Sequence, residues 1–142
     1  MLTWPTPRGD FERQCLSIFN WAQGVFFWTE DQQVWHLPEF WATESDLEKN
    51  YEDNNGRILD DCDGFAAMCV IAARKVGLRS VFATCRTETG GYHCVCIIRR
   101  DNEALMLDNR QGRPLSLTEA ERIGYVFDMC SGESPGEPWR RL

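Results

Sequence analysis

The sequence predicts an α+β fold in which one helix packs on an antiparallel β-sheet. Apolar residues recur at helical spacing in one stretch, and β-rich runs separated by the turn sequences TGG and RDNE follow it. The helix is expected over residues 62–76 and the strands over 80–87, 92–99 and 104–109. At 142 residues, 43% of them hydrophobic, the chain has the length of one domain and can bury one sizeable core.

The helix at 62–76 is the clearest element in the chain. Its apolar residues share one face, which comprises Phe65, Met68, Cys69, Ala72, Ala73 and Val76, and Gly77 is placed to end it. An earlier helix is predicted after Asp10, which can cap it, because Phe11, Cys15, Ile18, Phe19 and Ala22 fall on one face. Gly24 should end or kink that helix.

Shorter elements complete the domain. The aromatic-rich stretch 25–45 has no sustained period and contains Pro38, so an irregular segment that wraps the core is expected. A short polar helix to about Tyr51 has two competing capping boxes, Thr43 with Asp46 and Ser45 with Glu48. Ser116 or Thr118 can cap a helix through Arg122, and 125–130 reads as a strand. We expect one domain over 1–142, with a loose tail at 131–142 except where Trp139 docks.

Charge and composition exclude several classes of partner. The sequence holds 15 Lys and Arg against 22 Asp and Glu, a net charge of −7, and has no basic stripe that could replace phosphate counterions, so nucleic acid is not an expected partner. The longest apolar run, 65–73, is too short to span a bilayer, and no export signal is visible at the amino terminus. We expect a cytoplasmic protein without membrane insertion; the small size and missing signal also suit a phage-encoded protein.

The seven cysteines form an odd set without tandem CxxC pairs, so we expect them to be reduced. Six of the seven are expected to fill the core as small apolar side chains. A zinc site built from His93, Cys94 and Cys96 is not expected, because strand alternation sends the two cysteines to the face opposite His93.

A hairpin can pair His93 with Asp108. If the turn is centred on residues 101–102, antiparallel partners sum to 203, and Asp108 lies one diagonal step from the position opposite His93. A carboxylate that accepts from an imidazole N–H fixes the tautomer of the ring and leaves the other nitrogen available as a base. This pair is therefore a candidate base and orienter.

The third candidate, Cys62, stands among aspartates at the start of the 62–76 helix. Neighbouring carboxylates disfavour a thiolate, but the positive end of the helix dipole and a nearby imidazolium would lower the thiol pKa. The first-turn N–H groups, including that of Cys62, could stabilise an oxyanion. From the residues alone an alternative stays open, in which Cys62 is an inert buried thiol and Asp108 begins an Asx turn.

A family resemblance extends this interpretation. The segments DDCDGFA, YHCVCII and LMLDNRQG, with WATESDLE upstream, resemble the bacterial transglutaminase-like cysteine proteinases, which include the LapG proteases, over about residues 35–112. The resemblance implies a papain-like or transglutaminase-like core. It also implies that Cys62 is the nucleophile, His93 the general base and acid, and Asp108 the orienter of a cysteine peptidase that works through a thioester. A protein or peptide substrate follows from this activity.

The resemblance also implies less certain features of the site. Trp41 corresponds to a tryptophan that assists at the oxyanion in transglutaminases, although an aromatic core residue is the alternative. Some relatives bind calcium around the cysteine, which makes Asp61 and Asp63 the matching ligands; the other interpretation is that they are solvated carboxylates at the helix start. No cofactor is required for the thiol chemistry. The chain departs from the family pattern at Glu44, where proline is frequent, and at Gly64, where an acidic residue is usual.

Other functions remain as alternatives. DCDGF is close to the D-C-S-G-[FL] motif of the NlpC/P60 cell-wall peptidases, although Asp63 replaces their usual serine. The same thioester chemistry also serves transamidation and deamidation. A third alternative is an inactive structural or binding protein that retains the fold. The sequence specifies neither the substrate sequence nor the oligomeric state.

Overall fold

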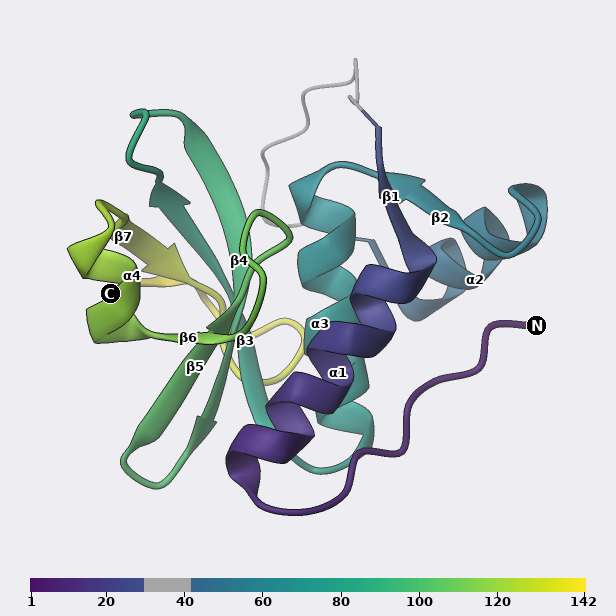
Figure 1. Ribbon diagram of the computed structural model, residues 1–142, viewed down its shortest axis with the longest axis horizontal. Coiled ribbons are helices and arrows are strands. Elements are labelled where there is room, and N and C mark those ends of the chain that lie inside the picture. Colours follow the sequence, from purple (N-terminus) through teal and green to yellow (C-terminus); the bar gives the residue numbers. More distant parts are fainter. Residues whose placement is uncertain (30–41) are drawn as a thin grey trace.

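The computed structural model describes residues 1–29 and 42–142, and these form helices and strands in mixed order along the chain (Figure 1). The helices are α1 (Phe11–Val25), α2 (Glu44–Asp53), α3 (Cys62–Lys75) and α4 (Leu117–Arg122). The strands are β1 (Phe26–Trp28), β2 (Ile58–Asp60), β3 (Arg79–Arg86), β4 (Tyr92–Arg100), β5 (Glu103–Leu107), β6 (Leu115–Ser116), β7 (Val126–Cys130) and β8 (Arg140–Arg141).

The larger sheet is antiparallel, with strand order β6-β5-β4-β3-β7-β8. Helix α3 packs on β3 and β4. Helix α1 lies beside α3 and also contacts β5 (Figure 1). The predicted α+β arrangement, with one helix on an antiparallel sheet, is therefore confirmed. No helix among the described residues has both the length and the apolar character needed to cross a membrane.

Strand β4 separates two apolar clusters because its side chains alternate between the two faces of the sheet. Cys94, Cys96 and Ile98 join the cluster under α1 and α3, whereas Val95 and Ile97 join a smaller cluster that includes Tyr125. This alternation is the predicted one. It keeps His93 on the face opposite the two neighbouring cysteines, which removes the geometric basis for a zinc site at these three residues.

The helix starts follow the capping residues in the sequence. Asp10 caps α1 through the N–H of Arg13, and the five predicted apolar residues of this helix are buried. Of the two competing capping boxes, Thr43 with Asp46 is the one that forms at α2. Ser116 caps α4.

Three features of the fold differ from the sequence-based expectation. Gly24 lies inside α1, which ends one residue later. Val76 is not a core residue: it is the C-cap of α3 and is 38% exposed, because the chain leaves the helix there and turns at Gly77. Strands β1 and β2 form a parallel pair that the sequence did not indicate: β1 falls in the stretch 25–45, which was expected to be irregular, and no element was expected at residues 58–60, since strands of three residues are too short to show a period.

The β4–β5 hairpin has the predicted register. Arg100 pairs with Glu103 and Cys96 pairs with Leu107, so partners sum to 203. The ladder ends at Leu107, two residues earlier than expected, and Asp108 therefore lies just beyond the end of β5. This position lets its side chain turn toward His93, near the start of β4.

The carboxyl-terminal segment is more firmly attached than the expected loose tail. Trp139 packs against the core, as predicted, but β8 also pairs with β7. The guanidinium of Arg74 on α3 donates to the carbonyl oxygen of Gly132 at 3.0 Å, and the N–H of Ser131 donates to the carbonyl oxygen of Phe82 at 2.9 Å. These hydrogen bonds to backbone groups hold the start of the tail to α3 and β3.

Two helical glycines provide a matched test of the packing at the start of α3. A Cβ at Gly64 would lie 2.4 Å from the Cβ of Asp60, whereas a Cβ at Gly24 would meet nothing within 4 Å. We expect Gly64→Ala to lower the free energy of unfolding by about 1–3 kcal/mol through overpacking. Gly24→Ala should raise it by about 0.5–1 kcal/mol, because alanine is the better helix former. Urea unfolding of both variants measures the difference, and equal stability for the two would contradict the packing of Asp60 on Gly64.

Candidate active site

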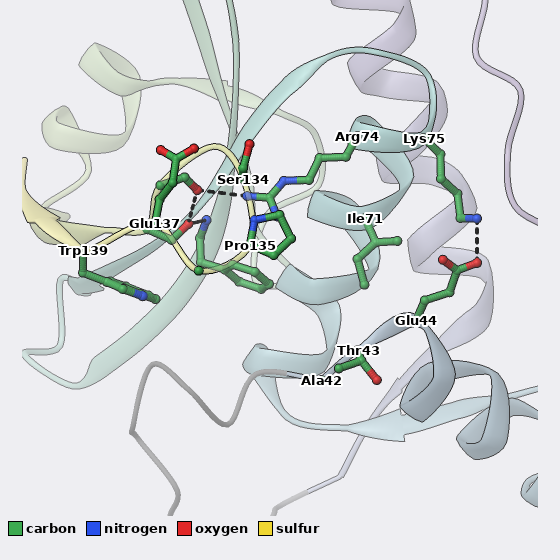
Figure 2. Close-up of a pocket in the computed structure, with 14 residues that line it drawn as sticks. Ala42, Thr43, Glu44, Ile71, Arg74, Lys75, Ser134, Pro135, Glu137 and Trp139 are labelled. Carbon is green, nitrogen blue, oxygen red and sulfur yellow. Dashed lines mark hydrogen bonds and ion pairs between the residues drawn. The ribbon is translucent and has the colours of Figure 1, made fainter.

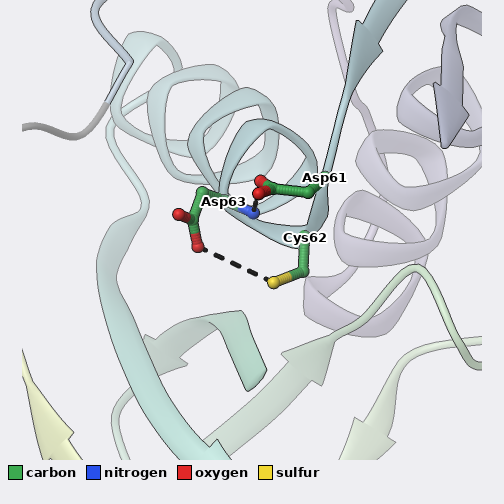
Figure 3. Close-up of side chains that lie close together, drawn as sticks. All are labelled: Asp61, Cys62 and Asp63. Atoms are coloured by element: carbon green, nitrogen blue, oxygen red, sulfur yellow. Dashed lines mark hydrogen bonds between the residues drawn. The ribbon is translucent and has the colours of Figure 1, made fainter. Parts of the chain in front are cut away.

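Cys62 is the first residue of α3, and its neighbours on both sides are carboxylates (Figure 3). Asp61 is the N-cap, and its side chain accepts from the N–H of Asp63 at 3.0 Å. The thiol of Cys62 points toward Asp63 and donates to its Oδ1 at 3.7 Å. The aspartates that flank the cysteine therefore have separate tasks: one caps the helix and the other contacts the thiol.

The cap leaves few first-turn donors for a ligand. The N–H of Asp63 is bound to the Asp61 side chain, and the N–H groups of Gly64 and Phe65 both approach the Asp61 carbonyl oxygen, at 3.2 and 3.4 Å. The cap therefore reduces the number of first-turn N–H groups that could stabilise an oxyanion. Within the described part of the chain, the N–H of Cys62 itself is the first-turn donor that the cap does not engage.

The electrostatics of Cys62 differ from the sequence-based expectation. Burial raises the pKa of the thiol, and the adjacent Asp63 carboxylate raises it further, with a smaller contribution from Asp61. The backbone N–H of Cys94 opposes this by hydrogen bonding to the sulfur. The expected lowering of the pKa by the helix dipole is therefore outweighed, because burial disfavours the thiolate and an adjacent carboxylate acts more strongly than partial charges on peptide groups.

His93 and Asp108 form the predicted pair. Nε2 of His93 lies 2.5 Å from Oδ1 of Asp108, and both side chains are shielded from water, at 7% and 0% exposure. Because a carboxylate only accepts, Nε2 carries the proton, and Nδ1 is the nitrogen left for other chemistry. The diagonal contact inferred from the hairpin register thus exists, although Asp108 has already left the strand.

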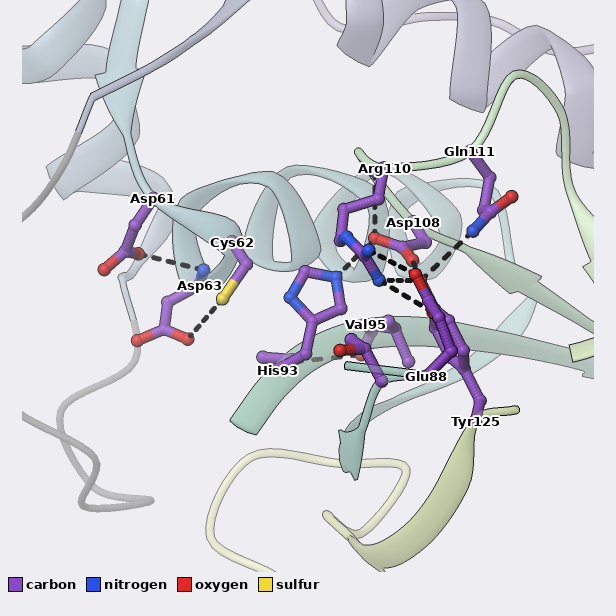
Figure 4. Close-up of polar contacts among 12 residues, drawn as sticks. Asp61, Cys62, Asp63, Glu88, His93, Val95, Asp108, Arg110, Gln111 and Tyr125 are labelled. Atoms are coloured by element: carbon purple, nitrogen blue, oxygen red, sulfur yellow. Dashed lines mark hydrogen bonds and ion pairs between the residues drawn. The ribbon is translucent and has the colours of Figure 1, made fainter. Parts of the chain in front are cut away.

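The imidazole lies between its carboxylate partner and the start of α3. Figure 4 shows the Nδ1 side of His93 turned toward Cys62, while the opposite nitrogen faces Asp108. The contact of the Cys62 sulfur with the N–H of Cys94, the residue after His93, is a second link between the helix tip and β4. The fold therefore places Cys62, His93 and Asp108 near one another, although the first and the last of them are 46 residues apart in the sequence.

Sequence reasoning missed the residues behind Asp108. Tyr125 is buried, at 2% exposure, and its hydroxyl donates to Oδ2 of Asp108 in a very short hydrogen bond. Arg110 and Gln111 donate to the same hydroxyl oxygen at 2.9 and 3.1 Å. The one available signal was general: a buried carboxylate needs hydrogen-bond donors, so Asp108 had to have further partners. Those partners come from turns, and no local sequence pattern reveals how turns pack.

The carboxylates at the start of α3 are also the candidate cation site. Ligand atoms of Asp61, Cys62 and Asp63 lie within 4.8 Å of one another. Carboxylate oxygens are suitable calcium ligands, whereas a thiol is not. The third acidic side chain that the family pattern places at position 64 cannot be accommodated, since the side chain of Asp60 fills that space. Two carboxylates therefore fit a cation of the calcium type, with the remaining ligands left to backbone oxygens and water.

The other sequence-predicted site residue, Trp41, lies outside the described residues. The six cysteines apart from Cys62 are buried and free of disulfides, as expected for core side chains. A separate cavity of about 600 Å³ lies between the carboxyl-terminal half of α3 and the segment 131–139 (Figure 2). None of the three candidate catalytic residues lines it.

Comparison with solved structures identifies the fold. The calcium-bound structure of Legionella pneumophila LapG matches with a TM-score of 0.66 at 14% identity, covering 88% of this chain and 65% of that one. The EGTA-treated LapG structure matches with a TM-score of 0.65 at 13% identity, over 90% and 65% of the two chains. A structure described as a TGase matches with a TM-score of 0.50 at 14% identity, over 83% and 33%.

These likenesses show a LapG-like, transglutaminase-like fold. The chain spans 65% of the length of the LapG chains. No protein-family model matches the sequence, and no curated protein matches it either. The predicted fold family is confirmed, and it rests on the arrangement of the elements, because sequence identity is low throughout.

The carboxylate beside the thiol generates a direct test. We expect Asp63→Asn to speed the alkylation of Cys62 by iodoacetamide at pH 7 by about 10-fold, since removing a carboxylate that raises the thiol pKa exposes more thiolate. Peptide mass spectrometry in EGTA follows each cysteine separately. Asp63→Glu, which keeps the charge, is the control, and an unchanged rate in Asp63→Asn would show that Asp63 does not control the thiol.

Proposed function

We propose that this protein is a thiol-dependent amide hydrolase, and first of all a cysteine peptidase, that uses Cys62, His93 and Asp108. The observation that supports it most is the contact of His93 Nε2 with the buried carboxylate of Asp108, at 2.5 Å. That contact leaves Nδ1 on the side of Cys62 as the nitrogen able to accept a proton. A buried histidine oriented in this way next to a helix-tip cysteine is the arrangement that nucleophilic thiol catalysis needs.

The reaction begins from a neutral thiol, because burial and Asp63 raise the thiol pKa. As sulfur attacks the carbonyl carbon of an amide, the thiol proton passes to Nδ1 of His93, and the carbonyl oxygen acquires negative charge. The N–H of Cys62 is a suitable donor to that oxygen. The imidazolium then gives its proton to the departing amine as the C–N bond breaks, which leaves a thioester on Cys62.

Water completes the cycle. His93 takes a proton from the water as its oxygen attacks the thioester, and the imidazolium returns a proton to the sulfur as the C–S bond breaks, which releases the carboxylic acid. Asp108 stays ionised and stabilises the imidazolium in both halves of the reaction. If an amine replaces water in the second half, the same residues carry out transamidation.

Asp61 and Asp63 are the residues that would hold calcium in this proposal. A bound divalent cation would supply positive charge next to the thiol and offset the effect of Asp63 on its pKa. The neighbouring LapG structure is described as calcium-bound. Because Asp61 and Asp63 are the two carboxylates of this cluster among the described residues, we expect the dependence on calcium to be modest.

The proposed triad is tested by three substitutions and a panel of substrates. Cys62→Ala and His93→Ala should reduce turnover to background, and Asp108→Asn should reduce kcat by about 100-fold or more because the histidine loses its orientation. Cys15→Ala, which changes a buried cysteine on α1, is the control and should retain activity. The panel contains denatured proteins, purified sacculi, and a glutamine peptide with a fluorescent amine.

The products separate the alternatives. New protein amino termini support a peptidase, muropeptide release would indicate a cell-wall peptidase, and amine incorporation would indicate a transamidase. No turnover of any substrate, together with alkylation of Cys62 that is as slow as that of the buried cysteines and insensitive to His93→Ala, would overturn the enzymatic proposal in favour of an inactive scaffold.

Calcium binding is tested by stability. Millimolar calcium should raise the melting temperature of the wild type relative to EGTA, because a ligand that binds only the folded state stabilises it. The rise should disappear in Asp63→Asn and persist in Asp128→Asn, a control carboxylate on β7 away from the cluster. If EGTA changes neither the melting temperature nor the alkylation rate of the wild type, Asp61 and Asp63 are only a cap and a neighbour of the thiol.

A further inference from the structure

We propose that Tyr125 is a positioning residue for the His93–Asp108 pair: its hydroxyl holds Asp108 Oδ2 so that Oδ1 faces the imidazole. The catalytic consequence rests on the proposed function, but the effect on His93 does not. Tyr125 lies after α4, about thirteen residues beyond the segment that carries the family resemblance, and it reaches Asp108 from behind.

The hydroxyl of Tyr125 has one proton and two lone pairs. Arg110 Nη1 and Gln111 Nε2 donate to the oxygen at 2.9 and 3.1 Å, so both lone pairs are engaged. The single proton is therefore directed to Asp108. Burial and the neighbouring Asp108 raise the pKa of Tyr125, so the hydroxyl remains protonated and is a donor at neutral pH.

Asp108 is fully buried and needs several donors to remain in place. Its Oδ1 accepts from His93 and, at 3.1 Å, from the backbone N–H of Arg110. Its Oδ2 accepts from Tyr125. With Tyr125 in place, both oxygens are assigned, and the carboxylate cannot rotate without breaking a buried hydrogen bond.

Arg110 does not neutralise Asp108 directly, because its side chain is directed elsewhere. Its guanidinium forms a two-point contact with Glu88, at 2.6 and 3.3 Å, in addition to its contact with Tyr125 (Figure 4). The turn before Tyr125 packs tightly on the turn between β3 and β4, which carries Glu88: a Cβ at Gly124 would lie 2.8 Å from the Cβ of Glu88. Three turns thus lock the hydroxyl behind Asp108.

The experiment measures the imidazole of His93 itself. The chain has two histidines, so ¹⁵N-histidine NMR of the full chain, with His36→Gln for assignment, follows His93 through a pH titration. Among the described residues, the titratable or charged side chains around the ring and its partner include Asp108, Glu88, Tyr125, Arg110, Cys85 and Cys62.

In Tyr125→Phe, Asp108 loses a donor to its charged form and becomes a stronger acceptor for the imidazolium, so the His93 pKa should rise by about 0.5 to 1 unit. The acid limb of the kcat/KM profile should move to higher pH by the same amount, and kcat should fall by about 10-fold with KM unchanged. Tyr92→Phe is the matched control: Tyr92 is on the same strand as His93, is 66% exposed, and should change neither quantity.

Gln111→Ala is the second variant, because it leaves the core intact and removes one donor to the Tyr125 oxygen. It should shift the His93 pKa in the same direction by a smaller amount. An unchanged His93 pKa in Tyr125→Phe, or in Gln111→Ala if Tyr125→Phe does not fold, overturns the positioning role. A shifted His93 pKa in a protein that turns over no substrate supports the positioning role while the proposed function fails, so the two outcomes are distinguishable.

Discussion

The arrangement of the site depends on a carboxylate that the fold buries completely. Asp108 ends the β4–β5 hairpin with no exposure to water, and every donor it needs has to be supplied by the protein. The hairpin register brings His93, the turn after Asp108 brings the N–H of Arg110, and the turn after α4 brings Tyr125. The His93 imidazole is held in one orientation because the Asp108 carboxylate is fixed. The carboxylate is fixed because three segments of the chain converge on it.

The helix tip presents the opposite situation, since Cys62 lies among charges that work against a thiolate. Asp61 is needed as the N-cap of α3, and Asp63 contacts the thiol directly. Burial raises the thiol pKa and these side chains raise it further, so Cys62, the proposed nucleophile, rests as a neutral thiol. A site of this kind depends on proton transfer to a well-placed base at the moment of attack, which gives the orientation of His93 more weight than it would have beside a preformed thiolate.

The position of Gly64 connects the fold and the site. Its missing side chain lets Asp60, at the end of β2, pack against the first turn of α3. The side chain of Asp60 therefore occupies the space that a side chain at position 64 would need. Among the described residues, Asp61 and Asp63 are the carboxylates that converge beside Cys62.

The sequence by itself determined those features that depend on near neighbours. Helical spacing located α1 and α3, side-chain capping limited the starts of α2 and α4 to two candidates each, and the two-residue turn after Arg100 set the hairpin register that pairs His93 with Asp108. These signals are local, because a cap, a period and a tight turn each act over a few residues.

Tertiary structure alone decided the rest. Strands β1 and β2 exist only because they pair with each other, and no pattern of three residues could announce them. The pKa of Cys62 was expected to fall and instead rises, since burial and the direction of the Asp63 side chain are set by packing. Tyr125 reaches Asp108 across 17 residues of chain, and a contact of that kind depends on how turns stack in space, not on any spacing in the sequence.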